Sequence, residues 1–69
     1  MDDTLSGIYD KLTTECDHAI YLASVIMLAA MQEQDSKKEH AAVTGMIKII
    51  KRAVTTAEQE LKDYENNNP

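Results

Sequence analysis

The 69-residue chain lacks phenylalanine and tryptophan, and it has one proline, two glycines and one cysteine. The proline is the last residue, Pro69, and the glycines are Gly7 and Gly45, so few positions break a helix. β-Branched residues do not alternate with polar ones, which disfavours strands. The lone Cys16 excludes an intrachain disulfide and fits a reducing compartment. The chain must gain its stability in another way.

Long apolar runs are also missing. The longest covers residues 19–31 and is interrupted only by Ser24, which makes 13 residues, whereas a membrane-spanning helix needs about 20. Residues 2 and 3 are aspartates, where a signal peptide carries basic side chains. We therefore expect a soluble, cytoplasmic protein that does not enter a membrane.

The charge is unbalanced, with 12 acidic and 7 basic residues and a formal net charge of -5. Nucleic-acid binding draws most of its affinity from lysine and arginine on phosphates, and anionic membranes attract cationic segments. Both are poor partners for an acidic chain. A small basic patch, Lys48, Lys51 and Arg52, leaves a helical-hairpin RNA-binding dimer as a weaker alternative.

Apolar residues recur every three or four positions in two stretches, which is the spacing of one face of a helix. In the first stretch they are Leu5, Ile8, Leu12, Cys16, Ala19, Ala23, Ile26 and Ala30. In the second they are Val43, Met46, Ile47, Ile50, Val54, Ala57, Leu61 and Tyr64. We predict a single domain over residues 1–65, with helices at 4–33 and 37–65, a turn at 34–36 and a disordered tail at 66–69.

Both predicted helices have a capping signal at their start. Thr4 is a candidate N-cap for the first helix. Residues 36–39 match a capping box, in which the Ser36 hydroxyl and the Glu39 carboxylate each accept a free backbone N–H. The short connection makes the helices antiparallel neighbours.

Residues whose numbers sum to about 69 then lie opposite each other in the hairpin. This places Asp17 near Arg52 and Lys11 near Glu58, so opposite charges meet. A domain of this size is only marginally stable alone and usually needs a disulfide, a metal or a partner chain. The predicted fold is therefore an all-α antiparallel helical hairpin that dimerises into a four-helix bundle.

The predicted helices carry more apolar surface than one hairpin covers. Tyr21, Val25 and Leu28 form a stripe nearly opposite the core face of the first helix, and Ala42, Ile49 and Ala53 flank the core face of the second. Such surface usually marks an interaction site. All of it could be the core of a homodimer. Alternatively, Ala42, Ile49 and Ala53 form the dimer interface while Tyr21, Val25 and Leu28 bind another protein.

No catalytic or cofactor-binding arrangement is recognisable in the sequence. Glu15 and His18 have the Glu-x-x-His spacing of di-iron bundles, but the positions expected opposite them, 51–54, offer no carboxylate. Cys16 is expected on the core face, and His18 points elsewhere, so a Cys–His nucleophile is not supported. We expect no catalytic, cofactor or metal site, and hence a protein that is not an enzyme.

In length and architecture the chain resembles a family of small phage-encoded anti-quorum-sensing proteins. The resemblance rests on the apolar stretch 20–28, the turn 35–38 and the second helix around 47–54. It implies an antiactivator that binds a LuxR-type transcription activator in the host cytoplasm, with a pilus assembly ATPase as a second target. We therefore expect a protein-binding inhibitor of a host regulator. A structural or adaptor subunit of a larger complex is the main alternative.

Overall fold

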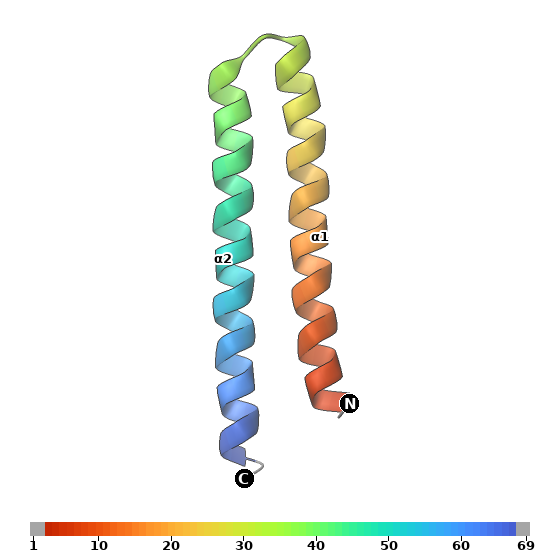
Figure 1. Ribbon diagram of the computed structural model, residues 1–69, viewed down its shortest axis with the longest axis vertical. Coiled ribbons are helices and arrows are strands. Elements are labelled where there is room, and N and C mark those ends of the chain that lie inside the picture. Colours follow the sequence, from red (N-terminus) through yellow and green to blue (C-terminus); the bar gives the residue numbers. More distant parts are fainter. Residues whose placement is uncertain (1–2, 68–69) are drawn as a thin grey trace.

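The computed structural model describes residues 3–67, which form two long helices and one tight turn (Figure 1). Helix α1 covers Asp3–Gln32 and helix α2 covers Ser36–Asn67. They lie side by side and antiparallel, which confirms the predicted all-α hairpin. Each helix begins one residue before its predicted start. Helix α2 also includes residues 66 and 67, which were expected in a disordered tail; residues 68–69 lie outside the described part.

The end of α1 is closed by a pair of backbone hydrogen bonds around Gln34. The Asp35 N–H donates to the Ala30 carbonyl at 2.9 Å, and the Gln34 N–H donates to the Met31 carbonyl at 3.1 Å. This is the Schellman pattern, in which the residue after the C-cap, here Gln34, has a left-handed backbone conformation. Gln34 has a φ of 54°. The chain therefore turns without glycine, at a position where glycine is usual.

Helix α2 is capped by Asp35, so the predicted capping box at Ser36 is wrong. The Asp35 carboxylate accepts a hydrogen bond from the Lys38 N–H at 3.0 Å. The Glu39 N–H, which the Ser36 hydroxyl was expected to cap, donates instead to the Asp35 carbonyl at 3.1 Å. Ser36 is the first helical residue. Aspartate and serine are both good N-caps, and the turn geometry selects the earlier of the two.

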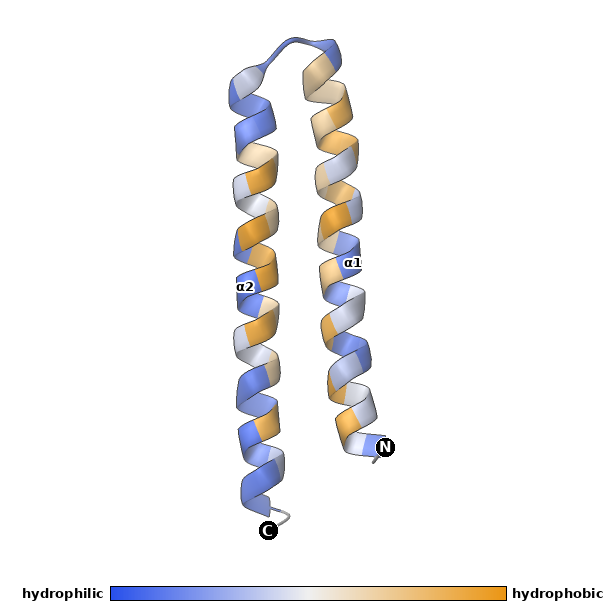
Figure 2. Cartoon of the chain, viewed as in Figure 1, coloured by the Kyte–Doolittle hydropathy of each residue, from blue (hydrophilic) through white to orange (hydrophobic). Residues whose placement is uncertain are grey.

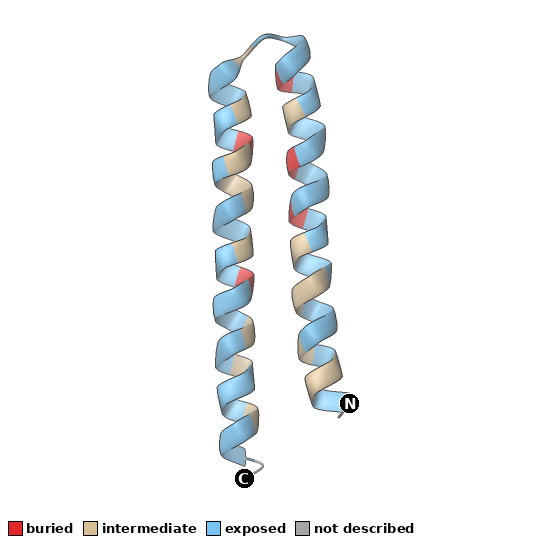
Figure 3. Cartoon of the chain, in the orientation of Figure 1, coloured by how far each residue is buried: buried red, intermediate tan, exposed pale blue. Residues whose placement is uncertain are grey.

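The two helices meet along a narrow seam made largely of small side chains. The buried residues are Ala19, Ala23, Ala30, Ala42 and Ala53. On α1 the least exposed apolar positions follow steps of three, four and four: Leu5, Ile8, Leu12, Cys16, Ala19, Ala23, Met27 and Ala30. This 11-residue repeat is close to the natural period of an α-helix, so the helices stay together along their whole length. In Figure 3 the buried positions face the neighbouring helix and most of the remaining surface is exposed.

The hairpin is a thin layer with a large surface for its mass. Its Cα extents are 54 × 16 × 8 Å, and it exposes 5395 Å² of accessible surface. A compact protein of 7.7 kDa exposes about 4,300 Å². The excess of roughly 1,100 Å² is partly apolar, because hydrophobic residues extend beyond the seam on both helices (Figure 2). No large side chain is fully buried among the described residues.

Candidate protein-binding site

The half of α1 nearest the turn is apolar around its whole circumference. Its buried positions, Ala19, Ala23 and Ala30, face α2. Large apolar side chains that are 44–66% exposed occupy the other directions: Ile20, Tyr21, Leu22, Val25, Ile26, Leu28 and Met31. A helix that is apolar all round is normally buried on all sides. Helix α2 covers one of those sides, and the remaining sides are candidate contact surfaces.

The predicted partner-binding residues form the outer edge of this segment. Tyr21, Val25 and Leu28 are 66%, 49% and 62% exposed. At 100° per residue they lie on the side of α1 away from the seam, as the sequence predicted. We call Tyr21, Val25 and Leu28 the outer stripe. The nearby Ser24 hydroxyl donates to the Ile20 carbonyl at 2.8 Å, so it presents no unpaired donor beside the stripe.

Two of the three predicted dimer-interface residues lie inside the hairpin. Ala42 is 8% exposed and Ala53 is 4% exposed, because both belong to the seam with α1. Small residues permit the close approach of the helices here, and a second chain could reach these alanines only if the hairpin opened. Ile49, in contrast, is 45% exposed. Of the predicted interface, Ile49 alone is accessible.

One broad side of the layer carries an apolar surface, although the sequence placed its three α2 residues on the core face of that helix. Helix α1 contributes three residues spaced by eleven and helix α2 three spaced by seven. Both spacings return to nearly the same side of a helix. These six residues are Tyr9, Ile20, Met31, Ile47, Val54 and Leu61, and their exposure ranges from 40% to 58%. We call them the apolar face. Toward the open end it is hollowed into a shallow groove of about 320 Å³ between Tyr9 and Val54.

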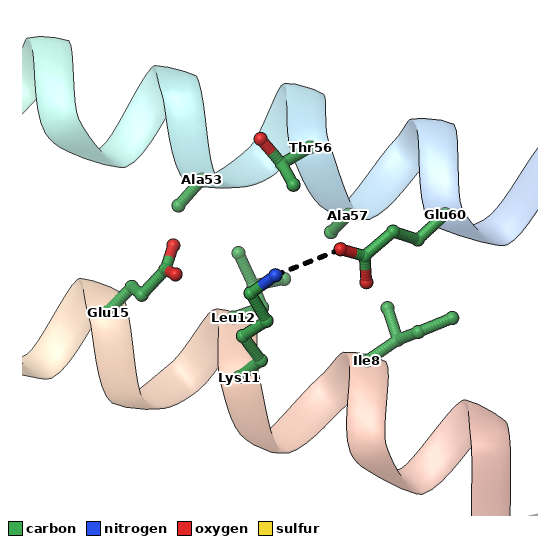
Figure 4. A pocket seen from close by; sticks show the side chains of 8 residues that line it. All are labelled: Ile8, Lys11, Leu12, Glu15, Ala53, Thr56, Ala57 and Glu60. Carbon is green, nitrogen blue, oxygen red and sulfur yellow. Dashed lines mark hydrogen bonds and ion pairs between the residues drawn. The ribbon is translucent and has the colours of Figure 1, made fainter.

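The opposite broad side is polar toward the open end of the hairpin. There Lys11 Nζ lies 3.0 Å from Glu60 Oε1 (Figure 4). The gap that these side chains and Glu15 border has a volume of about 10 Å³, which is room for about one water molecule. The hydrogen bond to Glu60, and then its negative charge, raise the pKa of Lys11.

The observed ion pairs differ from the predicted ones in detail. Lys11 was expected to face Glu58, but Glu58 lines the groove on the other broad side. The partner of Lys11 is Glu60, two residues further along α2. Between residues 3 and 67 the second ion pair is Lys38–Glu33, with 2.7 Å between Nζ and Oε2, across the turn. Asp17 and Arg52 make no ion pair. The charges therefore support the predicted antiparallel register, with the contacting residues shifted.

The remaining polar residues do not assemble into a metal or nucleophile site. Within the described residues no three histidine, cysteine or carboxylate side chains come close enough to hold a metal ion. Cys16 is half-buried in the seam and His18 is exposed. In the same part of the chain, neither helix combines the length and hydrophobicity needed to cross a bilayer.

The fold and its surfaces define an antiparallel helical hairpin with exposed apolar sides. Comparisons with known proteins found no match, whether to a protein-family model, a curated protein or a solved structure.

Proposed function

We propose that the chain is a small protein-binding inhibitor, active as a homodimer, that covers a functional surface of a host regulatory protein. The observation that supports this most is the apolar circumference of residues 19–31, of which the hairpin buries only Ala19, Ala23 and Ala30. Exposed apolar surface of this extent marks protein contacts. Nothing in the described side chains suggests catalysis, and we propose no enzymatic role.

The outer stripe is the proposed contact with the regulator. Tyrosine is enriched among the residues that dominate binding energy, and such residues lie at the centre of an interface. Tyr21 is the most exposed of the large apolar residues, and Val25 lies between it and Leu28 on the same edge. The net charge of -5 favours a target whose surface is basic, because complementary charge steers association. A DNA-binding surface has that character.

This proposal extends to a class of target through the resemblance stated above. A phage antiactivator of a LuxR-type transcription factor has the acidic charge and small size that the proposal requires. In the host cytoplasm it would bind the activator and prevent it from engaging DNA. A pilus assembly ATPase is the proposed second target. Neither step needs a cofactor, a metal or a nucleic-acid contact by the chain itself.

The test measures binding of the chain to a purified LuxR-type activator and release of that activator from its operator DNA. Val25→Glu places a charge at the centre of the outer stripe and is expected to abolish both. Thr14→Glu is the control, because position 14 lies eleven residues earlier on the same edge of α1 and is exposed. It adds the same charge outside the stripe.

Light scattering and circular dichroism of all three proteins accompany the binding measurement. The proposal is rejected if a folded Val25→Glu variant binds the activator as well as wild type does. It is also rejected if the wild-type chain leaves the activator on its operator at saturating concentration.

A further inference from the structure

We propose that the apolar face is the surface on which a second copy of this chain docks, with the two turns at the same end of the resulting four-helix bundle. This rests on the proposed function only in taking the active protein to be a homodimer. It assigns the face and the orientation, which the sequence left open. Helix α1 of each copy then packs on α2 of the other.

The excess accessible surface of the whole chain is larger than the area that a stable interface buries on one partner. The chain exposes roughly 1,100 Å² more than a compact protein of its mass, and a stable interface buries about 800 Å² per partner. The apolar face extends over both helices, from Tyr9 and Leu61 near the open end to Met31 near the turn. The opposite side cannot do the same, because Lys11, Glu15 and Glu60 occupy its open half.

Two hydroxyl groups within the apolar face are already hydrogen-bonded inside the chain. The Thr13 hydroxyl donates to the Tyr9 carbonyl at 3.1 Å, and the Ser24 hydroxyl donates to the Ile20 carbonyl at 2.8 Å. Covering a polar group is costly when it loses its hydrogen bond to water and finds no other. These two hydroxyls keep their acceptors when the face is covered, so docking leaves neither donor without a hydrogen bond.

Charges at the border of the apolar face select the orientation. Asp17 lies three residues before Ile20, on the outer border of the face on α1. Lys51 lies between Ile47 and Val54 on the outer border on α2, and both charges are exposed.

The register of the hairpin gives the height of each residue along the helix axis. Leu12 and Ala57 line one groove, so residues whose numbers sum to about 69 lie at the same height. Asp17 and Lys51 sum to 68. With the turns together, Asp17 of each copy meets Lys51 of the other.

The reverse orientation, with the turns at opposite ends, brings like charges together. Asp17 and Lys51 both lie at the middle of their helices, which span Asp3–Gln32 and Ser36–Asn67. Inverting one copy therefore sets Asp17 against Asp17 and Lys51 against Lys51. Asp10 does not favour either orientation. With the turns together it lies near both Glu58 and Lys62 of the second copy, whose charges are opposite. The central pairs decide the orientation.

Docking on the apolar face leaves the outer stripe uncovered. Tyr21, Val25 and Leu28 lie on the free edge of α1, roughly a quarter turn from the face at 100° per residue. Ile49 lies on the opposite broad side of the layer. The dimer would therefore display two outer stripes, one on each α1. Self-association and capture of a regulator use different residues and are tested separately.

A charge exchange between Asp17 and Lys51 tests the proposed orientation. Sedimentation equilibrium at low salt gives the dimer dissociation constant of wild type, D17K, K51D and the double variant D17K/K51D. Each single variant turns two attractive contacts into repulsive ones and is expected to weaken the dimer about tenfold. The double variant restores both pairs and is expected within about threefold of wild type. Both positions are exposed helix surface, and circular dichroism verifies that each variant folds.

Cross-linking gives an independent readout of the orientation in a C16S background. A thiol linker of about 10 Å is expected to join a D17C chain to a K51C chain and not to join two D17C chains. Self-linking of D17C would overturn the proposal, since only the reverse orientation brings those positions together. A monomeric wild type, or a double variant weaker than either single variant, would overturn it as well. Loss of regulator binding by a dimeric Val25→Glu variant tests the proposed function and leaves the docking result unchanged.

Discussion

The Asp35 carboxylate accepts a 3.0 Å hydrogen bond from the Lys38 backbone N–H, which makes Asp35 the N-cap of α2. Asp35→Ala removes that acceptor and is expected to lower the free energy of unfolding by about 1 kcal/mol. Ser36→Ala is the matched control and is expected to change it by only a few tenths of a kcal/mol. Urea unfolding at one fixed chain concentration measures both. A larger loss in Ser36→Ala would restore the capping box at residue 36.

Gln34 occupies a conformation that suits glycine better than glutamine. Its φ of 54° costs an L-residue about 1–2 kcal/mol, and part of the gain from glycine is offset by the greater freedom of the unfolded chain. Gln34→Gly is therefore expected to stabilise the hairpin by about 0.5–1 kcal/mol. Gln34→Ala keeps the strain and should have little effect. Thermal unfolding compares the two, and a destabilised glycine variant would contradict the Schellman assignment.

The Lys11–Glu60 ion pair is expected to change how the Lys11 side chain titrates. The pKa of Lys11 is raised from 10.5 by the hydrogen bond and charge of Glu60. Since the folded-state pKa is raised, the stabilisation is complete below about pH 10.5 and is lost as pH rises through the higher value. Glu60→Gln should return the pKa of Lys11 toward its ordinary value, whereas Glu58→Gln should leave it raised. NMR titration of the Lys11 side chain distinguishes the two carboxylates.

The periodicity of apolar residues was enough to predict the two helices, the turn between them and their antiparallel pairing. Spacing also placed Tyr21, Val25 and Leu28 away from the core. Spacing could not predict which flank of α2 would enter the seam, because hydrophobicity ranks Ile49 above Ala42 and Ala53. Close approach of two helices favours small side chains instead, so the alanines are buried and the isoleucine is exposed. Likewise, Asp35 and Ser36 both suit the N-cap of α2, and the sequence does not distinguish them. The geometry of the turn places Asp35 at the cap.

The close seam is itself testable at Ala30, which is 0% exposed. Ala30→Leu inserts a large side chain where the helices touch and is expected to cost about 1–3 kcal/mol of unfolding free energy. Ala29→Leu adds the same volume at the adjacent exposed position and should be nearly neutral. Chemical denaturation measures the difference between them. Equal effects at both positions would show that the helices do not approach closely at the turn end.

Ile47 and Ile49 offer a final contrast, because they are two residues apart on α2, equally apolar and similarly exposed at 43% and 45%. Ile47 belongs to the apolar face, whereas Ile49 lies on the opposite broad side of the hairpin. A charge buried without a partner in an interface is strongly unfavourable. Ile47→Glu is therefore expected to shift the protein from dimer to monomer in sedimentation equilibrium, while Ile49→Glu leaves the dimer intact. The reverse result would place the second copy on the Ile49 side. Because both variants carry the same glutamate on the same helix, a general loss of helicity would affect both and could not produce the contrast.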